Sequence, residues 1–196
     1  MEYGTRYRIE VLFMAYNIQP LRTQKEIDDF LACLDKTNNP DRNKFLLLFG
    51  INTGLRVSDI VVLKVGQINN TVKPIIKEQK TGKKKRLYLS SIQDLIHNYC
   101  DQKQDSDWLF PSRQGGHISV NDVYKMFRKV RQQLGRDDIG THTMRKTYGY
   151  WFYKSTHDLA TLQLLFNHSS ENITKRYIGV TEDDMENSLK GFKIGY

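Results

Sequence analysis

Six side chains with complementary chemistry are spread along this chain of 196 residues. Arginine side chains are planar forks that match phosphate oxygens and stay charged at any working pH. Histidine can move a proton, and a tyrosine hydroxyl can act as a nucleophile. Such a set is coherent for phosphoryl transfer, in which a nucleophile attacks in line and cations neutralise the phosphate oxygens. The six residues are Arg56, Lys80, His142, Arg145, His168 and Tyr177.

Five of these residues lie on predicted helices or at their ends, and Lys80 lies in a predicted hairpin turn. The sequence TGLRVSD at 53–59 puts Arg56 just beyond a glycine, at a helix start. In HTMR, His142 and Arg145 are three residues apart, so both project from one helix face. In HSSENITKRY, His168 lies at the end of one helix and Tyr177 within the next.

Helix signals are clear in the first third of the chain. Thr23 and Glu26 form a capping box that begins a helix, and apolar residues follow at helical spacing until Asn38-Asn39-Pro40. A second helix runs through the apolar block 45–51 and ends near Gly54, a plausible left-handed cap. A short helix with Val57, Ile60, Val61 and Leu63 inward follows.

The texture changes at residues 72–90, where two β-prone runs flank the polar turn that contains Lys80 and Gly82, which predicts a hairpin. Ser91 is expected to begin another helix. Ser119 and Asp122 form a second capping box, before a helix with Val120, Val123, Phe127, Val130 and Leu134 inward, closed by Gly135. Further helices are expected at about 142–154, 158–167, 171–178 and 182–190. The prediction is an α+β fold, mostly helical, with one small antiparallel hairpin.

Composition is consistent with a globular protein that acts on a polyanion. The chain is 39% hydrophobic and carries a net charge of +8, with a pI near 9.4. An excess of this size suits nucleic acid, because neutralised phosphates release counterions. A basic protein without such a partner is the alternative that charge alone leaves open.

Other function classes find no support in the sequence. Cys33 and Cys100 lack metal-site spacing and predict a reducing compartment. His142 and His168 alone are too few ligands for a metal site. No run approaches a membrane span, and the N-terminus lacks the apolar region of a secretory signal. We therefore expect a cytoplasmic protein with no membrane contact and no small-molecule substrate.

In their order and spacing, the six residues resemble the catalytic set of the tyrosine recombinase (phage integrase) family. The resemblance rests on Arg56 in TGLRVSDI, Lys80 in QKTGK, the HTMR motif, His168 in FNHSS and Tyr177 in TKRYIG, and covers roughly residues 23–180. Some positions depart from the commonest pattern, namely Asp59 for Glu, Met144 for Leu, Lys146 for a second His, and Phe166-Asn167 for Leu-Gly. These departures concern the subfamily and remove no group that the chemistry needs.

The resemblance implies a role for each residue. Tyr177 would form a 3′-phosphotyrosyl bond, Arg56 and Arg145 would bind the phosphate, and Lys80 would protonate the leaving 5′ oxygen. His142 would accept the tyrosine proton and His168 would hydrogen-bond the phosphate, with no metal, ATP or other cofactor required. The partner would be double-stranded DNA and the active complex a homo-tetramer on two duplexes, which gives site-specific recombination or integration, typical of mobile elements in bacteria or phage.

Plainer interpretations remain beside these. Lys80 lies near four other cations, Lys83, Lys84, Lys85 and Arg86, which we expect to bind the DNA backbone, and Lys80 could be one more such contact. The arginines could be surface ion-pair partners and the histidines buried structural residues. Rival functions are a non-catalytic DNA-binding regulator and a type IB topoisomerase-like enzyme.

We expect three segments: a leader at 1–22, the catalytic domain at 23–180, and a tail helix at 181–196 that docks on a neighbouring protomer. The family usually carries a separate N-terminal domain that clamps DNA, and the short leader predicts its absence here, either in a minimal form or through truncation.

Overall fold

Two capping motifs delimit the first helices of the structure, a computed structural model that describes residues 18–180, 189–190 and 192–195. The Thr23 hydroxyl accepts a hydrogen bond from the Glu26 backbone nitrogen, and the Glu26 carboxylate accepts one from the Thr23 backbone nitrogen, so α2 (Gln24–Asp35) begins where the capping box predicts. The next helix, α3 (Pro40–Thr53), ends at Gly54, whose φ of 62° is the left-handed conformation expected there.

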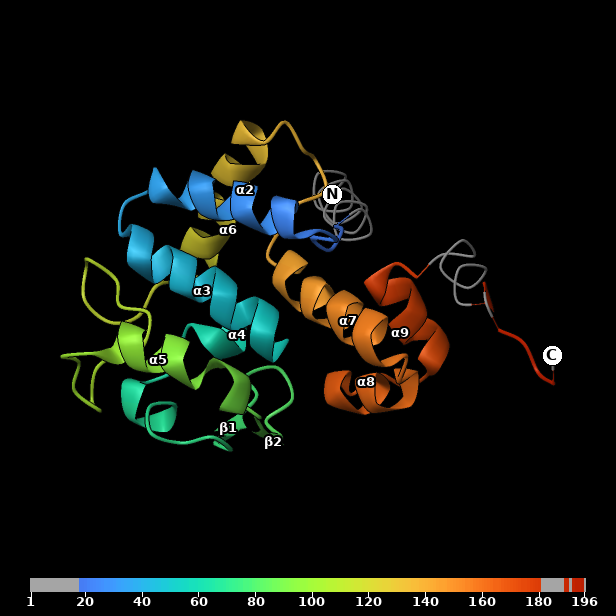
Figure 1. Cartoon of the computed structure of the whole chain (residues 1–196). Coiled ribbons are helices and arrows are strands. Elements are labelled where there is room, and N and C mark those ends of the chain that lie inside the picture. The colour runs from blue at the N-terminus through green and yellow to red at the C-terminus, as the bar shows by residue number, and fades with distance from the viewer. Residues whose placement is uncertain (1–17, 181–188, 191, 196) are drawn as a thin grey trace, which may run out of the picture.

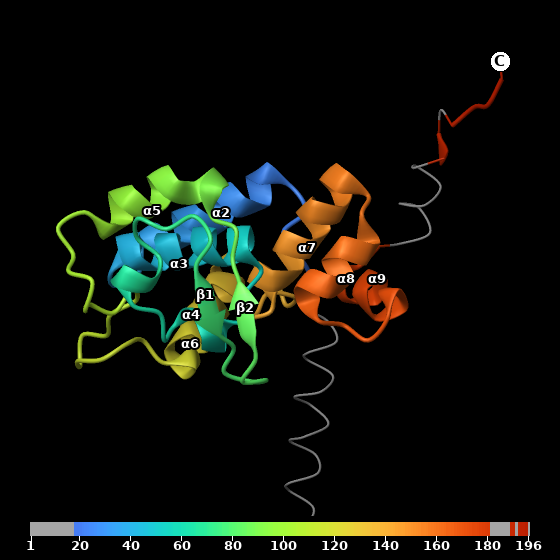
Figure 2. The ribbon, with the colours of Figure 1, turned by 90° about the horizontal axis from the view of Figure 1, so that it is seen from below.

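The predicted mixed fold is confirmed, with helices surrounding one two-stranded antiparallel sheet (Figures 1 and 2). Short 3-10 turns lie at Val65–Gln67 and Ser90–Ile92. None of the described helices is long and apolar enough to cross a membrane. The remaining elements are α4 (Val57–Ile60), β1 (Ile75–Lys77), β2 (Lys84–Arg86), α5 (Gln93–Cys100), α6 (Val120–Gln133), α7 (Thr143–Thr156), α8 (Leu159–Phe166) and α9 (Glu171–Ile178).

Helix α3 forms the centre of the larger hydrophobic cluster. Its apolar run buries Phe45, Leu46, Leu47 and Phe49 against α2, α5 and α7. A smaller cluster joins α7, α8 and α9, in which Phe166 and Ile178 are buried and Tyr177 is packed at the edge. Figure 1 shows α8 and α9 together at one end of the molecule beside α7. Helix α7 therefore contacts both clusters and fixes their relative position.

The hairpin presents different residues on its two faces. Strand register pairs Ile75 with Arg86, Ile76 with Lys85, and Lys77 with Lys84. Because side chains alternate along a strand, Ile76 and Lys85 face the body of the protein.

Three local predictions need correction. Ser91 lies inside a 3-10 turn and caps nothing, and α5 begins at Gln93. Val120 is 41% exposed because it lies in the first turn of α6, outside the apolar stripe. The Ser119 hydroxyl accepts from the Asp122 backbone as expected, but it donates to the Asp122 carboxylate, so no reciprocal box forms.

The segment before α2 is bound across α7. The Leu21 backbone nitrogen donates to Thr147 Oγ1 at 2.8 Å, and the Trp151 indole donates to the Leu21 carbonyl at 2.9 Å. The Arg22 guanidinium donates at 3.1 Å to the carbonyl of Gly179, the C-cap residue of α9. Residues 1–17 and most of the expected 182–190 helix lie outside the described residues, and the three-segment division stays a prediction.

Candidate active site

A buried arginine connects three elements at the centre of the site. Arg145, in the first turn of α7, is 3% exposed. Its Nη1 donates to the Gly54 carbonyl at 2.5 Å and its Nη2 to the Phe166 carbonyl at 3.0 Å. Its guanidinium also lies over the Phe166 ring, 4.2 Å from the centroid. These contacts hold the end of α3 and the end of α8 around one positive charge.

Gly54 is needed for this arrangement. Its φ of 62° is one that side chains rarely adopt, and a Cβ atom there would lie 2.5 Å from the Tyr148 ring. The glycine lets the chain turn sharply, so that Arg56 becomes the N-cap residue of α4 beside Arg145. The structure therefore brings together the two arginines predicted for the site.

The tyrosine and first histidine of the predicted set also meet. His142 is the N-cap residue of α7, and its Nδ1 lies 3.3 Å from the Tyr177 hydroxyl on α9. The Tyr177 ring packs edge-on against Phe166, with centroids 5.6 Å apart. The 3.3 Å between His142 Nδ1 and the Tyr177 hydroxyl is at the long end for a hydrogen bond, as is common for catalytic pairs without substrate.

The second histidine lies on the other side of the same tyrosine. Asn167 adopts the left-handed conformation that ends α8, which turns His168 back toward α9. The His168 ring is 5.1 Å from the Tyr177 ring, and its Nδ1 lies 3.0 Å from Thr174 Oγ1. The Thr174 hydroxyl can donate to the Ser170 carbonyl, so His168 Nδ1 carries its proton toward Thr174 and leaves Nε2 free.

Positive charge dominates the electrostatics of the site. Burial, with the charges of Arg145 and Arg56, lowers the pKa of His168 to about 4. Surrounding protein, together with the cations Lys146 and Arg145, lowers the pKa of His142, although part of this ring reaches solvent. Both histidines are therefore neutral at pH 7, and His142 can accept a proton.

The nucleophile candidate is protonated in the free chain. Burial raises the pKa of Tyr177 above its ordinary value, while the charges of Arg145 and Arg56 oppose the rise. An anion bound between the arginines would offset their charges, so they would no longer lower the pKa of Tyr177. The phenol would then need a base in direct contact to take its proton. His142 is the group at that position.

Sequence reasoning missed an acidic residue that pairs with Arg56. Glu78 is 5% exposed and its Oε1 accepts from Arg56 Nη1 at 3.1 Å. Burial raises the pKa of Glu78, but the Thr81 hydrogen bond and the Arg56 charge lower it more, so it is ionised. No motif marks Glu78, because its partner lies 22 residues earlier in the chain.

Asp59, on α4, contacts the hairpin turn that follows β1. Its Oδ1 accepts from the Gln79 backbone at 2.7 Å, while its Oδ2 is buried with no hydrogen-bond partner among the described residues. The hairpin turn is thus tied to α4 at two successive residues, Glu78 and Gln79.

The hairpin lysines separate into two kinds. Lys80 is exposed in the turn between β1 and β2 and close enough to His142 for its charge to lower that pKa. Lys85 faces inward, and its Nζ donates to the Leu165 carbonyl at the end of α8 at 2.9 Å. Burial and the Arg145 charge lower the pKa of Lys85 to about 8.

Lys85 therefore does not share the environment of the other three expected DNA-binding cations. Lys83, Lys84 and Arg86 are exposed, whereas strand alternation turns Lys85 toward α8. Five residues of the predicted set lie together, and Lys80 is exposed in the hairpin turn within electrostatic reach of His142. Among the described residues, no three His, Cys, Asp or Glu side chains are grouped as metal ligands.

Lys146, the residue that follows the HTMR motif, is also buried at the site. Its Nζ donates to the Ile18 carbonyl at 2.6 Å and lies 5.3 Å from the Tyr177 ring centroid. The motif departure at this position thus places an ammonium group against the candidate nucleophile.

The comparisons with known proteins agree with this geometry. Residues 21–183 match the family described as "Phage integrase family". The chain belongs to the phage integrase family. It is 40% identical over 177 residues to the "Probable integrase/recombinase YoeC" of Bacillus subtilis (strain 168), covering 89% of this chain and 97% of that protein.

More distant relatives of the family are longer than this chain. The chain is 26% identical over 174 residues to "Tyrosine recombinase XerH" of Campylobacter jejuni, covering 84% of this chain and 49% of that protein. The fold resembles a crystal structure of "XerH site-specific recombinase bound to difH substrate", with a TM-score of 0.61 and 21% identity, over 90% of this chain and 55% of that one. The chain thus spans about half the length of these relatives and nearly all of YoeC.

The low pKa of His168 predicts an acid-sensitive fold. Since the folded state binds the His168 proton more weakly than the unfolded state, stability is full above pH 6.5 and falls as pH drops toward 4. We expect His168→Gln to remove part of this fall, so that the Tm lost between pH 7 and pH 4.5 shrinks by about 2–4 °C. That shift corresponds to roughly 1 kcal/mol in a chain of this size, after allowance for solvent screening of a partly exposed ring.

Thermal unfolding at the two pH values measures this difference. His157→Gln is the matched control, because His157 is exposed and lies outside the site. Equal losses of Tm for the wild type and His168→Gln would contradict the assignment of a neutral, desolvated His168.

Proposed function

We propose that this chain cleaves and rejoins duplex DNA through a covalent bond between Tyr177 and a 3′ phosphate. The observation that carries the proposal is the Tyr177 hydroxyl 3.3 Å from His142 Nδ1, within reach of the charges of Arg145 and Arg56. Membership of the phage integrase family, whose relatives are named as integrases and recombinases, supports the same activity.

The chemical step uses this chain's own side chains. The Tyr177 oxygen attacks the scissile phosphorus, its proton passes to His142, and the bond from phosphorus to the 5′ oxygen breaks. Lys80 gives a proton to that 5′ oxygen, which leaves as a hydroxyl. Because the phosphotyrosine keeps the energy of the broken bond, attack by a 5′ hydroxyl reverses the sequence and rejoins a strand.

The arginines would bind the non-bridging oxygens of the phosphate. Arg145 is already oriented by two carbonyls, whereas Arg56 is paired with Glu78. A phosphate therefore competes with Glu78 for Arg56. Burial is the larger cause of the low pKa of His168 and the arginine charges add to it, so a bound phosphate would raise this pKa by offsetting the arginine charges. A His168 that gained a proton there would donate to the phosphate.

Double-stranded DNA is the partner that this proposal requires. The exposed cations Lys83, Lys84 and Arg86 lie on the hairpin that carries Lys80, and we expect them to contact the DNA backbone near the phosphate that is cut. A similar fold is known from XerH with its difH substrate. A cytoplasmic location, and site-specific recombination or integration as the outcome, belong to the same proposal.

Assembly into a homo-tetramer is the proposed active form. The tail carries exposed apolar side chains, with Leu189 66%, Phe192 68% and Ile194 74% exposed. A cavity of about 660 Å³ between β2 and the pair α7–α8 offers apolar surface at Tyr148, Phe152, Leu164 and Leu165, and Leu164 is 79% exposed. We assign this groove to the tail of a second copy of the chain, since both surfaces lose exposed apolar area when they meet.

The proposal predicts the fate of the nucleophile variant. Tyr177→Phe should bind DNA with wild-type affinity and form no covalent adduct with a suicide substrate that traps the cleaved state. Tyr150→Phe, a partly buried tyrosine outside the site, is the control and should form adduct normally. Adduct from Tyr177→Phe at the wild-type level would overturn the assignment. Loss of binding in every variant would instead indicate a misfolded protein.

The two hairpin lysines make different predictions on a modified substrate. In a 5′-bridging phosphorothiolate substrate, the 5′ sulfur leaves as a thiolate without needing a proton. Such a substrate therefore does not need the general acid. We expect Lys80→Met to cut ordinary DNA at least about 100-fold more slowly and to recover on the thiolate, the scale of a lost acid catalyst. Lys85→Met should show a smaller defect that the thiolate does not repair, because Lys85 acts through its contact with Leu165. Rescue of Lys85→Met with no rescue of Lys80→Met would transfer the acid role to Lys85.

The tail proposal predicts a defect confined to assembly. The double variant Leu189→Ser and Phe192→Ser removes apolar surface that is already exposed, so it leaves folding and single-site binding intact. Cooperative binding to paired sites, followed by gel shift, should be lost, and Leu164→Ser in the groove should have the same effect. Val72→Ser, which is 47% exposed elsewhere, is the control. Normal cooperativity in both variants would remove the tail from the interface.

A further inference from the structure

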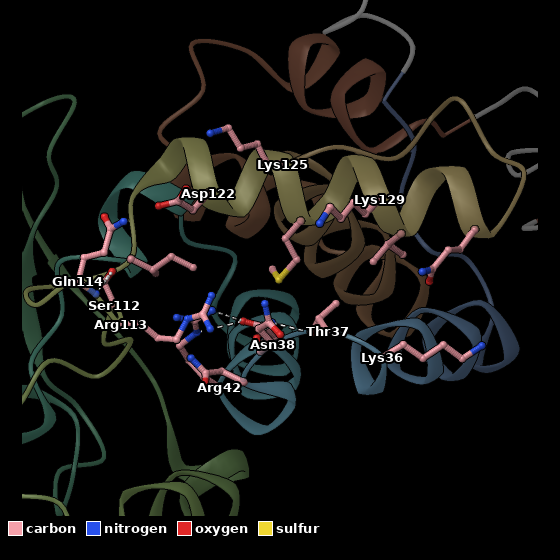
Figure 3. Close-up of a pocket in the computed structure, with 16 residues that line it drawn as sticks. Lys36, Thr37, Asn38, Arg42, Ser112, Arg113, Gln114, Asp122, Lys125 and Lys129 are labelled. Carbon is pink, nitrogen blue, oxygen red and sulfur yellow. Dashed lines mark hydrogen bonds between the residues drawn. The ribbon is translucent and has the colours of Figure 1, made fainter.

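A second concave site lies at the far end of α3 from the tyrosine. It is a cavity of about 580 Å³ bounded by α6, the turn between α2 and α3, and the loop at 112–114 (Figure 3). Arg42 and Asn43 begin α3 at this cavity, whereas Arg56 follows the other end of the same helix. We call this cavity the α6 cleft.

The α6 cleft is strongly basic. Five cations line it against a single carboxylate, Asp122, which accepts from the Ser119 hydroxyl. Figure 3 shows Asp122, Lys125 and Lys129 along α6, with Arg42, Arg113 and Asn38 on the opposite side of the cavity. The five cations are Lys36, Arg42, Arg113, Lys125 and Lys129.

The charges in the cleft lack anionic partners in the part of the chain that the structure describes. Arg42 is half-buried, and its guanidinium donates to neutral acceptors, the Pro111 carbonyl at 2.7 Å and the Asn43 side chain at 3.0 Å. Nearby Arg136, by contrast, is paired with both Glu26 and Asp138. With one carboxylate against five cations, the cleft carries an excess of positive charge that a bound anion would neutralise.

The form of the cleft fits a chain of phosphates rather than one small anion. Lys125 and Lys129 lie one helical turn apart along the exposed side of α6, and Arg113 is exposed on the opposite wall. The wall also offers neutral donors such as Asn38, Ser112 and Gln114. Cations in a row with polar donors between them match the oxygen pattern of a sugar–phosphate backbone.

The cleft also lies where a bound duplex can reach it. Helix α6 packs on α4, which begins directly after Arg56. Figure 2 shows α6, α4 and the hairpin turn on the same lower side of the molecule. The 14 residues of α3 span about 20 Å, or about six base pairs at 3.4 Å each.

We propose that the α6 cleft binds the phosphate backbone of duplex DNA about six base pairs from the scissile phosphate. This inference rests on the proposed function for its ligand, but the cleft contributes no group to the chemical step. It acts as a second point of attachment, which fixes the angle at which the duplex crosses the tyrosine.

The test compares two lengths of DNA in one assay. Duplexes closed at both ends by uncharged linkers extend either about four or about twelve base pairs to each side of the scissile phosphate, so that only the long duplex reaches the cleft. The double variant Arg113→Gln and Lys129→Gln removes one charge from each wall. The control Lys25→Gln and Lys154→Gln removes the same net charge from exposed positions outside the cleft.

On the long duplex we expect the cleft variant to bind about tenfold more weakly, with a salt slope smaller by about 2, one for each lost phosphate contact. On the short duplex it should equal the wild type, and the control should change little at either length. An unchanged affinity on the long duplex, or an equal loss at both lengths, would overturn the proposal. A second result would also overturn it. If inorganic phosphate raises the Tm of the wild type and the control but not of the cleft variant, and the cleft variant binds DNA normally, the cleft binds a small anion and not DNA.

The outcome is separable from that of the proposed function. Covalent adduct formation by Tyr177, measured at saturating protein on the long duplex, should survive in the cleft variant. A length-dependent binding defect without any adduct from the wild type would support the cleft and reject the catalytic proposal. Adduct formation without a length-dependent defect would do the reverse.

Discussion

The buried charge of Arg145 is the interaction on which the rest of the site depends. A guanidinium that is 3% exposed has to satisfy its donors within the protein, and it does so with carbonyls at the ends of α3 and α8. Arg56 follows shortly after the end of α3, and His168 follows shortly after the end of α8. Arg145 therefore orients its neighbours before any phosphate arrives, and a Lys at this position would lack the fork that reaches both carbonyls.

Burial and concentrated positive charge act together on several groups of the site. They lower the pKa values of His142, His168 and Lys85, and both histidines are neutral at pH 7. The free site is thus short of negative charge, with Glu78 occupying Arg56. A bound phosphodiester corrects the imbalance, which is the arrangement expected of a site built to stabilise an anionic transition state.

Local signals made much of the fold predictable. The capping box at Thr23, the left-handed Gly54 and the polar turn after residue 76 each act over a few residues, so their chemistry is visible in the sequence. The candidate site was predictable because its six residues occur in short motifs. What stayed hidden depends on contacts between distant segments: Glu78 with Arg56, and Lys85 with Leu165. A run of four cations looks uniform until the strand register turns one of them inward.

The segment that precedes α2 has a further consequence, because it contacts both α7 and α9, the helix that carries Tyr177. Lys146 bonds to the Ile18 carbonyl while lying against the Tyr177 ring, and Arg22 bonds to the carbonyl that ends α9. The free energy of ordering residues 18–22 is therefore coupled to that of ordering α9, and the coupling acts equally in both directions. Displacing residues 18–22 would therefore raise the free energy of the orientation in which Tyr177 faces His142.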